Sequence, residues 1–227
     1  MKTHILLPLA ALALLSACDK TSGDAPKGNE TAGTVAAPAG TNWAETVSET
    51  TDGGFMMGNP NAPVKLVEYG SYTCSHCGEF AAKGIPQVIE NYVKTGKVSF
   101  EYRSYVRDPF DVVGALTTRC GGSGPFFQMS EQMFAEQASW MGKLQGVGQD
   151  QMAAMSKLPP AQQFAEIAKL AGFDKFALER GIPAEKLNAC FADKATIDKL
   201  VAMRDKANTE VQLTGTPTFL INGEKVI

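Results

Sequence analysis

Residues 64–77 of this 227-residue chain read VKLVEYGSYTCSHC, and within them one local pattern changes into another. The first six residues are rich in β-branched and aromatic side chains, which is typical of a strand. Gly70 then begins a short turn. Cys74 and Cys77 follow this turn with two residues between them, and a helix is expected to begin at the pair. The spacing therefore places both sulfur atoms on one helical turn, directly after a strand.

The chain beyond the cysteines continues as helix and then as strand. Apolar residues at helical spacing occur within 85–93, where Pro86 is expected to kink or restart the helix, and Gly96 is expected to end it. Alternation of apolar and polar side chains predicts a second strand over 98–103. Strand, helix and strand in this order make a βαβ unit, for which a right-handed crossover is expected.

Residues 108–211 carry mainly helical signals. Asp108-Pro109 has the features of an N-cap followed by a first-turn proline. Further helices are expected to start or end at five punctuating residues: Pro125, Pro160, Gly172, Gly181 and Pro183. After this block a strand is expected from about Thr218, and Asn222-Gly223 predicts a hairpin turn.

The N-terminus has the features of an export signal. Lys2 supplies a positive charge, and residues 5–15 are an apolar run that is too short to span a membrane comfortably. The run ends in LSAC at 15–18, which resembles the bacterial lipobox, in which the cysteine carries lipid. A plain secretory signal cleaved nearby is the alternative. We expect 1–17 to be a lipoprotein signal peptide and Cys18 the lipid attachment site, and either reading permits disulfides.

The part between the signal and the folded domain has a different composition. Residues 19–42 are rich in Gly, Ala, Thr, Ser and Pro and contain almost no large apolar side chains. Such a segment cannot bury enough surface to offset the entropy of ordering. We therefore expect a flexible tether and lead-in over 18–58, followed by the folded domain over 59–227.

Composition argues against two kinds of partner. The formal net charge is −3 and the sequence has no basic block, which argues against nucleic acid. The two histidines are His4, within the expected signal peptide, and His76. A mature protein with one histidine cannot hold a multi-histidine metal site, and we expect no bound metal.

The two cysteines are expected to differ in reactivity. Cys74 falls at the helix N-terminus, where free N–H groups and the macrodipole favour negative charge, so its pKa is expected to fall and Cys74 to be the solvent-facing nucleophile. Cys77 is expected to be more buried and to resolve mixed disulfides. His76 is expected to add positive charge or a hydrogen bond to the thiolate, and Ser75 to donate a hydrogen bond. A structural disulfide and half of a zinc site are the alternatives, but the first closes a very short loop and the second lacks another ligand pair.

Glu68 precedes Cys74 by six residues and shares a strand face with residues 64 and 66. We expect it to point inward beneath the cysteines, where a buried carboxyl has a raised pKa and can move protons during exchange. An edge-strand glutamate in water is the alternative. Glu101 and Arg103, on one face of the next strand, are expected either to pair with Glu68 or to be solvated.

The order of strand, CxxC, helix, strand, helical insertion, Thr-Pro and strand resembles the DsbA-like branch of the thioredoxin superfamily, from about Val64 onward. The resemblance implies an α/β, thioredoxin-like fold with an inserted helical domain over about 108–211. It implies that Pro217 is a cis-proline facing the cysteines, that Thr216 offers backbone hydrogen bonds to a substrate strand, and that Glu68 matches a buried acid. Ser75 stands where the best-known motif of this branch has proline, which bears on redox strength.

The same resemblance implies a thiol–disulfide oxidoreductase that introduces disulfides into exported, unfolded proteins, with Cys74–Cys77 as its redox centre and no separate cofactor. A DsbB-type, quinone-linked membrane oxidase would restore the disulfide. Lipid on Cys18 would hold the protein on the periplasmic side of a membrane, and Asp19 favours the inner membrane. The alternatives are a disulfide reductase or isomerase, and a non-enzymatic copper-handling or cytochrome-assembly thiol protein, since thiolates suit copper(I).

Two further expectations concern the second half of the chain. Cys120 and Cys190 both fall in the presumed insertion, and in an oxidising compartment we expect them to form a structural disulfide rather than two buried thiols. The chain stops four residues after Asn222-Gly223, where the family would complete a strand and add a terminal helix. We expect a truncated C-terminus that leaves one face of the sheet poorly covered.

Overall fold

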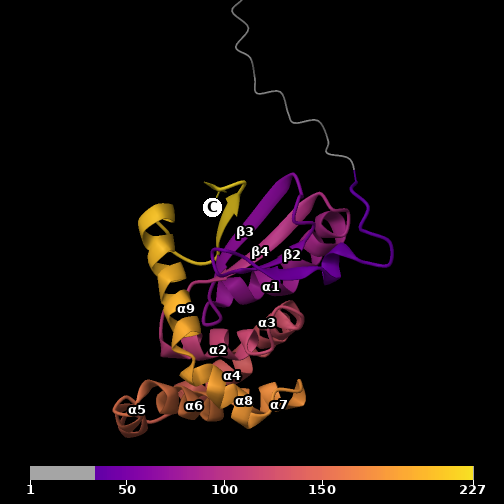
Figure 1. Ribbon diagram of the computed structural model, residues 1–227. Helices are drawn as coiled ribbons and strands as arrows, with labels where there is room; N and C mark the ends of the chain where they lie inside the picture. Colours follow the sequence, from indigo (N-terminus) through magenta and orange to yellow (C-terminus); the bar gives the residue numbers. More distant parts are fainter. Residues whose placement is uncertain (1–33, 227) are drawn as a thin grey trace, which may run out of the picture. The chain divides into compact units, whose positions relative to one another are not determined.

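The structure is a computed structural model that describes residues 34–226; the expected signal peptide and Cys18 lie outside the described residues. A six-stranded mixed sheet carries helices around it, and most of the later helices gather at one end of the sheet (Figure 1). The strands are β1 (Val47–Glu49), β2 (Phe55–Gly58), β3 (Val64–Gly70), β4 (Val98–Ser104), β5 (Thr218–Ile221) and β6 (Glu224–Lys225). Their order across the sheet is β1-β2-β4-β3-β5-β6.

One α-helix, α1, lies between β3 and β4 in the sequence, and the others lie between β4 and β5. The α-helices are α1 (Ser75–Val88), α2 (Pro109–Arg119), α3 (Phe126–Ala135), α4 (Gln137–Gln145), α5 (Gln149–Met155), α6 (Pro160–Ala171), α7 (Phe173–Glu179), α8 (Ala184–Ala192) and α9 (Lys194–Lys206). The shorter turns are a 3-10 helix η1 (Trp43–Glu45) and two π-helical turns, η2 (Ile89–Val93) and η3 (Ala207–Val211).

The expected βαβ unit forms the centre of the molecule. β3 and β4 are parallel and pair along their whole length, from Val64 opposite Val98 to Gly70 opposite Ser104. α1 joins them. Pro86 does not restart this helix, because α1 runs through it to Val88 and continues as the π-helical turn η2. At the other edge of β3, β5 pairs in the antiparallel sense and turns into β6.

The folded part begins before the expected boundary at Asn59. β2 pairs with β4, placing Phe55 opposite Tyr102, and β1 pairs in turn with β2. Phe55 and Trp43 are buried. The expected lead-in over 18–58 therefore contributes two strands and part of the core, because the free edge of β4 can pair with an upstream segment as well as with β3.

The insertion is built as the sequence indicates. The helices α2 to α9 lie between β4 and β5, and Asp108 caps α2 by accepting a hydrogen bond from the Asp111 N–H at 2.9 Å. The expected bond between Cys120 and Cys190 is present, with an S–S distance of 2.04 Å, and it joins the C-terminal end of α2 to α8. The bond closes a loop that contains α3 to α7.

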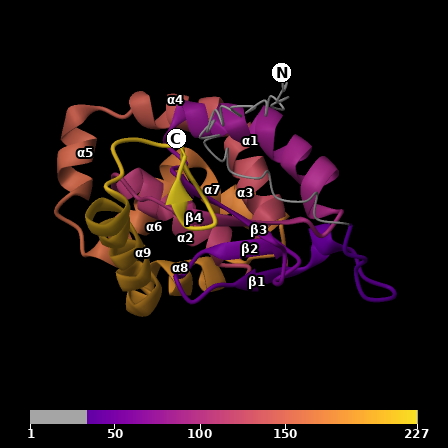
Figure 2. The ribbon, with the colours of Figure 1, turned by 90° about the horizontal axis from the view of Figure 1, so that it is seen from above.

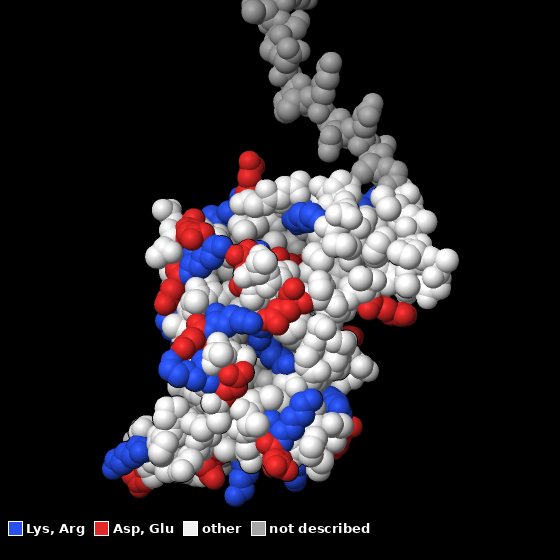
Figure 3. Space-filling model, in the orientation of Figure 1, with Lys and Arg blue, Asp and Glu red and all other residues white. Residues whose placement is uncertain are grey.

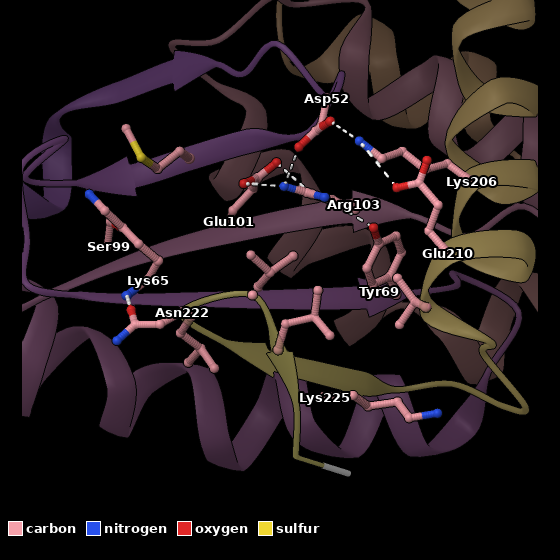
Figure 4. A pocket seen from close by; sticks show the side chains of 16 residues that line it. Asp52, Lys65, Tyr69, Ser99, Glu101, Arg103, Lys206, Glu210, Asn222 and Lys225 are labelled. Atoms are coloured by element: carbon pink, nitrogen blue, oxygen red, sulfur yellow. Dashed lines mark hydrogen bonds and ion pairs between the residues drawn. The ribbon is translucent and has the colours of Figure 1, made fainter.

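The two faces of the sheet have different environments. Leu66 and Phe100 belong to the face beneath α1, where the apolar side chains of the helix and of η2 pack against them. The opposite face carries a cavity of about 740 Å³ that is lined by Val67 and Leu220 and by several charged side chains (Figure 4). Figure 2 shows the strands from above, with α1 and α9 on different sides of them.

Charged side chains of both signs are interspersed on the face of the molecule shown in Figure 3. Many are joined in ion pairs. Lys199 bonds Glu49 and Lys206 bonds Asp52, each at 2.6 Å, so that α9 is tied to the segment around β1. Among residues 34–226, no helix has the length and apolar character that a membrane span requires.

Candidate active site

The cysteine pair lies where β3 ends and α1 begins. Cys74 has an extended backbone and is the N-cap of α1, and its carbonyl accepts a hydrogen bond from the Gly78 N–H at 3.1 Å. Both cysteines carry free thiols. Cys77 is completely buried, and only 6% of Cys74 is exposed. Cys74 is more exposed than Cys77, as expected, but it is less open to solvent than the sequence indicated.

A loop from the other end of the chain covers Cys74. The Cys74 thiol donates a hydrogen bond to the Thr216 carbonyl at 3.1 Å, across 142 residues of sequence. The peptide bond between Thr216 and Pro217 is cis. The Thr216 hydroxyl is buried without a hydrogen-bond partner among the described residues. The structure therefore brings together three of the expected site residues, Cys74, Thr216 and Pro217.

The environment of Cys74 favours its thiolate. Burial alone would raise the pKa of this thiol, but the nearby Thr216 side chain, the Cys77 thiol and the backbone N–H groups of Cys77 and His76 outweigh it, and the pKa is lowered. The carbonyl of Thr216 acts in the other direction, because it accepts a bond that only the protonated thiol can donate. The hydrogen-bond donors at the helix N-terminus therefore have the larger effect on the Cys74 pKa, as the position of this residue predicts.

Cys77 has the opposite character. Burial raises the pKa of the Cys77 thiol far above its usual value, and the charges of Glu68 and Cys74 add to the effect. The backbone N–H of Ser71, 3.5 Å from the Cys77 sulfur, acts in the opposite direction and is the second-largest influence after burial. The pair therefore combines one thiol whose pKa is lowered with one whose pKa is raised.

Glu68 lies inward, as its place on the strand predicts. It is completely buried, and neither carboxyl oxygen has a hydrogen-bond partner among the described residues. Burial, and to a smaller extent the charge of Cys74, raises the pKa of the Glu68 carboxyl to about 8. A carboxyl with this pKa can hold or release a proton near neutral pH beside the two sulfurs.

Neither alternative expected for Glu101 and Arg103 is correct: they do not pair with Glu68, and both are largely shielded from solvent. Arg103 bonds Glu101 and Asp52, each at 2.8 Å (Figure 4). In the register of the strands Tyr102, rather than Glu101 or Arg103, lies opposite Glu68. Side chains alternate between the faces of a sheet, so Glu101 and Arg103 lie on the other face, that of the large cavity.

The two residues between the cysteines are exposed. Ser75 and His76 have no side-chain hydrogen bond within the described part of the chain. The contribution of His76 to Cys74 comes from its backbone N–H. The hydrogen bonds expected from both side chains are therefore absent in this structure, since the helix turns them outward.

Polar residues in α2 and just before it hold the turn that precedes Cys74, and the sequence did not indicate them. The buried carboxylate of Asp111 accepts bonds from the Ser71 hydroxyl at 2.6 Å and from the Tyr72 N–H at 2.7 Å. Arg107 donates to the hydroxyls of Ser71 and Thr73 at 2.9 and 2.7 Å. Burial raises the pKa of Asp111 to about 6. A capping signal at Asp108 was visible, but nothing marked Asp111 as a partner of the turn.

Comparison with known proteins shows that this fold is similar to that of DsbA-like proteins. The chain belongs to the thioredoxin family: a family model described as Thioredoxin matches residues 50–227. The expectation of a DsbA-like, thioredoxin-like α/β fold with inserted helices is confirmed.

Two solved structures illustrate the likeness. The chain is similar to a protein-disulfide isomerase from Novosphingobium aromaticivorans, with 34% identity over 75% of this chain and 87% of that chain, and a TM-score of 0.72. It shares its fold with alpha-DsbA1 from Wolbachia pipientis, with 24% identity over 73% of each chain and a TM-score of 0.59.

Curated relatives carry the name "Putative protein-disulfide oxidoreductase". The protein of Rickettsia bellii is 22% identical over 74% of this chain and 57% of its own length. That of Rickettsia felis is 24% identical over 76% of this chain and 54% of its own length. The chain thus spans about half the length of the curated relatives it matches.

Proposed function

We propose that this protein oxidises cysteines of exported, unfolded proteins by dithiol–disulfide exchange at Cys74 and Cys77. The observation that carries the proposal is the contrast between the two thiols, because the pKa of Cys74 is lowered while that of Cys77 is raised. Stabilising one thiolate stabilises the reduced protein, and a stabilised reduced form makes the disulfide a stronger oxidant. No separate cofactor takes part, since the disulfide itself accepts the electrons.

The proposed reaction has two exchange steps. In the oxidised enzyme, a substrate thiolate attacks the Cys74 sulfur, the Cys74–Cys77 bond breaks, and Cys77 leaves and takes up a proton. The protonated Glu68 carboxyl, buried beside both sulfurs, is the proposed source of that proton. A second substrate thiolate then attacks the substrate sulfur of the mixed disulfide, and Cys74 leaves as a thiolate. Two electrons pass from the substrate to the enzyme, and the substrate gains one disulfide.

The direct test is equilibration of Cys74–Cys77 in glutathione buffers of defined ratio. We expect a reduction potential above that of thioredoxin, about −270 mV, and below that of DsbA, about −120 mV. These two values are the general reference points of the field. Ser75 in place of proline is the reason to expect the weaker oxidant. A potential at or below about −270 mV would contradict oxidation as the main activity and would favour the reductase alternative.

The isomerase alternative has an observation of its own, because the Novosphingobium structure is titled a protein-disulfide isomerase. Reduced protein is incubated with a substrate that holds non-native disulfides, and oxidised protein with the same substrate in reduced form. Faster recovery of the native substrate in the first mixture than in the second would favour isomerisation. The copper-handling alternative is tested by adding copper(I) to the reduced protein, where tight binding without exchange activity would support it.

The proposed place of action is the periplasmic side of a bacterial membrane, with lipid on Cys18 and a DsbB-type, quinone-linked oxidase as the partner that restores the disulfide. Support comes from the resemblance of residues 15–18 to a lipobox and from the tether-like composition that follows. Cys18→Ser should release the protein from membranes or block its processing. Unchanged fractionation and an unchanged mature mass would exclude lipidation.

A further inference from the structure

Gln137, the first residue of α4, holds the backbone on both sides of Thr73. Its side-chain Nε2 donates to the carbonyl of Tyr72 at 2.6 Å and to the carbonyl of Cys74 at 2.9 Å. An amide nitrogen carries two hydrogens, so both donors of this side chain are used. Gln137 belongs to the insertion and lies 63 residues from Cys74 along the chain.

The close fit of this contact is visible at Gly78, in the first turn of α1. A Cβ atom added to Gly78 would lie 2.7 Å from the Gln137 side-chain oxygen, nearer than real Cβ contacts. A glycine at this position therefore leaves room for the amide beside the helix. Within the described residues, the Cys74 carbonyl accepts two bonds, one from Gln137 and one from the Gly78 N–H at 3.1 Å.

Other inserted helices hold the same short segment from different directions. Asp111 of α2 accepts from the Tyr72 N–H at 2.7 Å, and Ser130 of α3 lies 2.9 Å from the Tyr72 hydroxyl. The Tyr72 ring also packs on Phe134 of α3, with 4.8 Å between ring centroids. These contacts fix Tyr72, whereas Gln137 alone among them reaches the carbonyl of the reactive cysteine.

We propose that Gln137 is a positioning residue for Cys74, through which the inserted helices set the reactivity of the sulfur. The inference rests on the proposed exchange chemistry. A carbonyl held by two donors fixes the orientation of the Cys74–Ser75 peptide. That orientation decides where the sulfur lies relative to the N–H groups of His76 and Cys77, which stabilise its thiolate. Without Gln137 the cap can rotate, and the sulfur is held less closely against these donors.

The test uses two variants of similar size and one matched control in the full-length protein. Gln137→Met removes both donors without adding charge. Gln137→Glu keeps the shape but turns the donor into a carboxylate that faces two carbonyl oxygens. Gln145→Ala changes the same residue type at the exposed end of the same helix, where the side chain makes no hydrogen bond within the described residues. The readouts are the Cys74 pKa from thiolate ultraviolet absorbance, the equilibrium constant with glutathione, and the thermal midpoint of the oxidised protein.

We expect the pKa of Cys74 to rise by about half a unit in Gln137→Met, which lowers the thiolate fraction below the pKa about threefold. In Gln137→Glu we expect a rise of about one unit, or about tenfold, because a negative charge is added near the sulfur. The equilibrium with glutathione should shift toward the oxidised protein in both variants. Gln145→Ala should match the wild type.

Unchanged pKa and glutathione equilibrium in both Gln137 variants, even with a lower thermal midpoint, would overturn the inference, since the role would then be structural. A shift of the same size in Gln145→Ala would overturn it as well. Failure of the proposed function has a different signature: the wild-type protein itself would show an unperturbed Cys74 or no exchange with glutathione.

Discussion

The folded part of the chain contains four cysteines, which form two pairs in different chemical states. Cys74 and Cys77 are separated by three positions and carry free thiols, whereas Cys120 and Cys190 are separated by 70 positions and are bonded. The first pair lies at a strand–helix junction beneath a loop, surrounded by N–H donors and the Glu68 carboxyl. The second pair joins α2 to α8 inside the insertion. Identical sulfur chemistry thus serves exchange in one place and cross-linking in the other.

The difference teaches that the surroundings and the loop length, rather than the residue type, separate the two uses. Closing a long loop removes much entropy from the unfolded chain, so a bond such as Cys120–Cys190 favours the folded state. Closing a very short loop gives little of this effect, so Cys74–Cys77 can open and close at low cost to the fold. Nearby charges and hydrogen-bond donors then decide how readily each sulfur reacts.

Removing one reactive sulfur should give the largest effect on activity. In Cys74→Ala we expect oxidation of a reduced model substrate to fall at least about a thousandfold, because the attacked sulfur is lost. In Cys77→Ala we expect mixed disulfides between Cys74 and the substrate to accumulate, visible by mass under non-reducing conditions. Exchange that persists in Cys74→Ala would break the comparison, since another pair would then be reactive.

Removing the second pair should act on stability instead. We expect Cys120→Ala with Cys190→Ala to lower the free energy of unfolding by roughly 4 kcal/mol, from the loop-closure entropy of the 70-residue separation. Urea unfolding of the oxidised proteins measures this difference. The rate of substrate oxidation should stay within about twofold of the wild type. A large loss of rate with little loss of stability would reverse the roles assigned to the two pairs.

Glu68→Gln should change how stability depends on pH. The folded-state pKa of about 8 lies above the usual 4.5, so the folded protein keeps a proton that the unfolded chain has released between these values. Stability should therefore fall as pH rises from about 4.5 to about 8 and level off above. At about 1.4 kcal/mol per unit, the fall is on the order of 5 kcal/mol, and Glu68→Gln should abolish it. Burial raises the pKa of Glu68 more than the charge of Cys74 does, so the effect should persist in the oxidised protein, which has no Cys74 thiolate. Urea unfolding of the oxidised protein near pH 5 and near pH 8 measures the difference. Parallel pH profiles for the two proteins would show that Glu68 is not buried as described.

His76→Ala should have the smallest effect. The imidazole is exposed and makes no hydrogen bond within residues 34–226, while its backbone N–H, which the variant keeps, contributes to the Cys74 thiolate. An exposed charge near a thiolate is worth little in water, so we expect the glutathione equilibrium constant to change by less than about threefold. A tenfold change in this equilibrium constant would show that the His76 side chain stabilises the Cys74 thiolate, as the sequence alone suggested.

Local patterns were sufficient for the centre of the molecule. Alternation in β3 and β4, the cysteine spacing at α1 and the Asp108 cap each depend on neighbouring residues, and each was found from the sequence. β1 and β2 were missed because they are short and are separated by a glycine-containing turn, and because β2, on which β1 pairs, is held by β4 across about 45 residues of sequence.

The site shows the same division. Cys74, Cys77 and Glu68 follow from spacing and strand alternation, and the resemblance supplied Thr216-Pro217. The low exposure of Cys74 could not be foreseen, since the covering loop is 142 residues away in sequence. Asp111 and Gln137 are ordinary polar residues in first turns of helices, and no local pattern separates a side chain that bonds another segment from one that faces water.

The loop over Cys74 also imposes an order of events on synthesis. A chain made from its N-terminus presents Cys74, Cys77 and Cys120 before Cys190 or Thr216 exists. At a synthesis rate of about 5–20 residues per second, the interval between Cys120 and Cys190 lasts roughly 4 to 14 seconds. During that interval Cys120 has no native partner, while the exposed Cys74 and Cys77 are both available to it. A chain that stays reduced until α8 has emerged avoids these non-native pairs, whereas a chain oxidised earlier needs thiol–disulfide exchange to reach the native one.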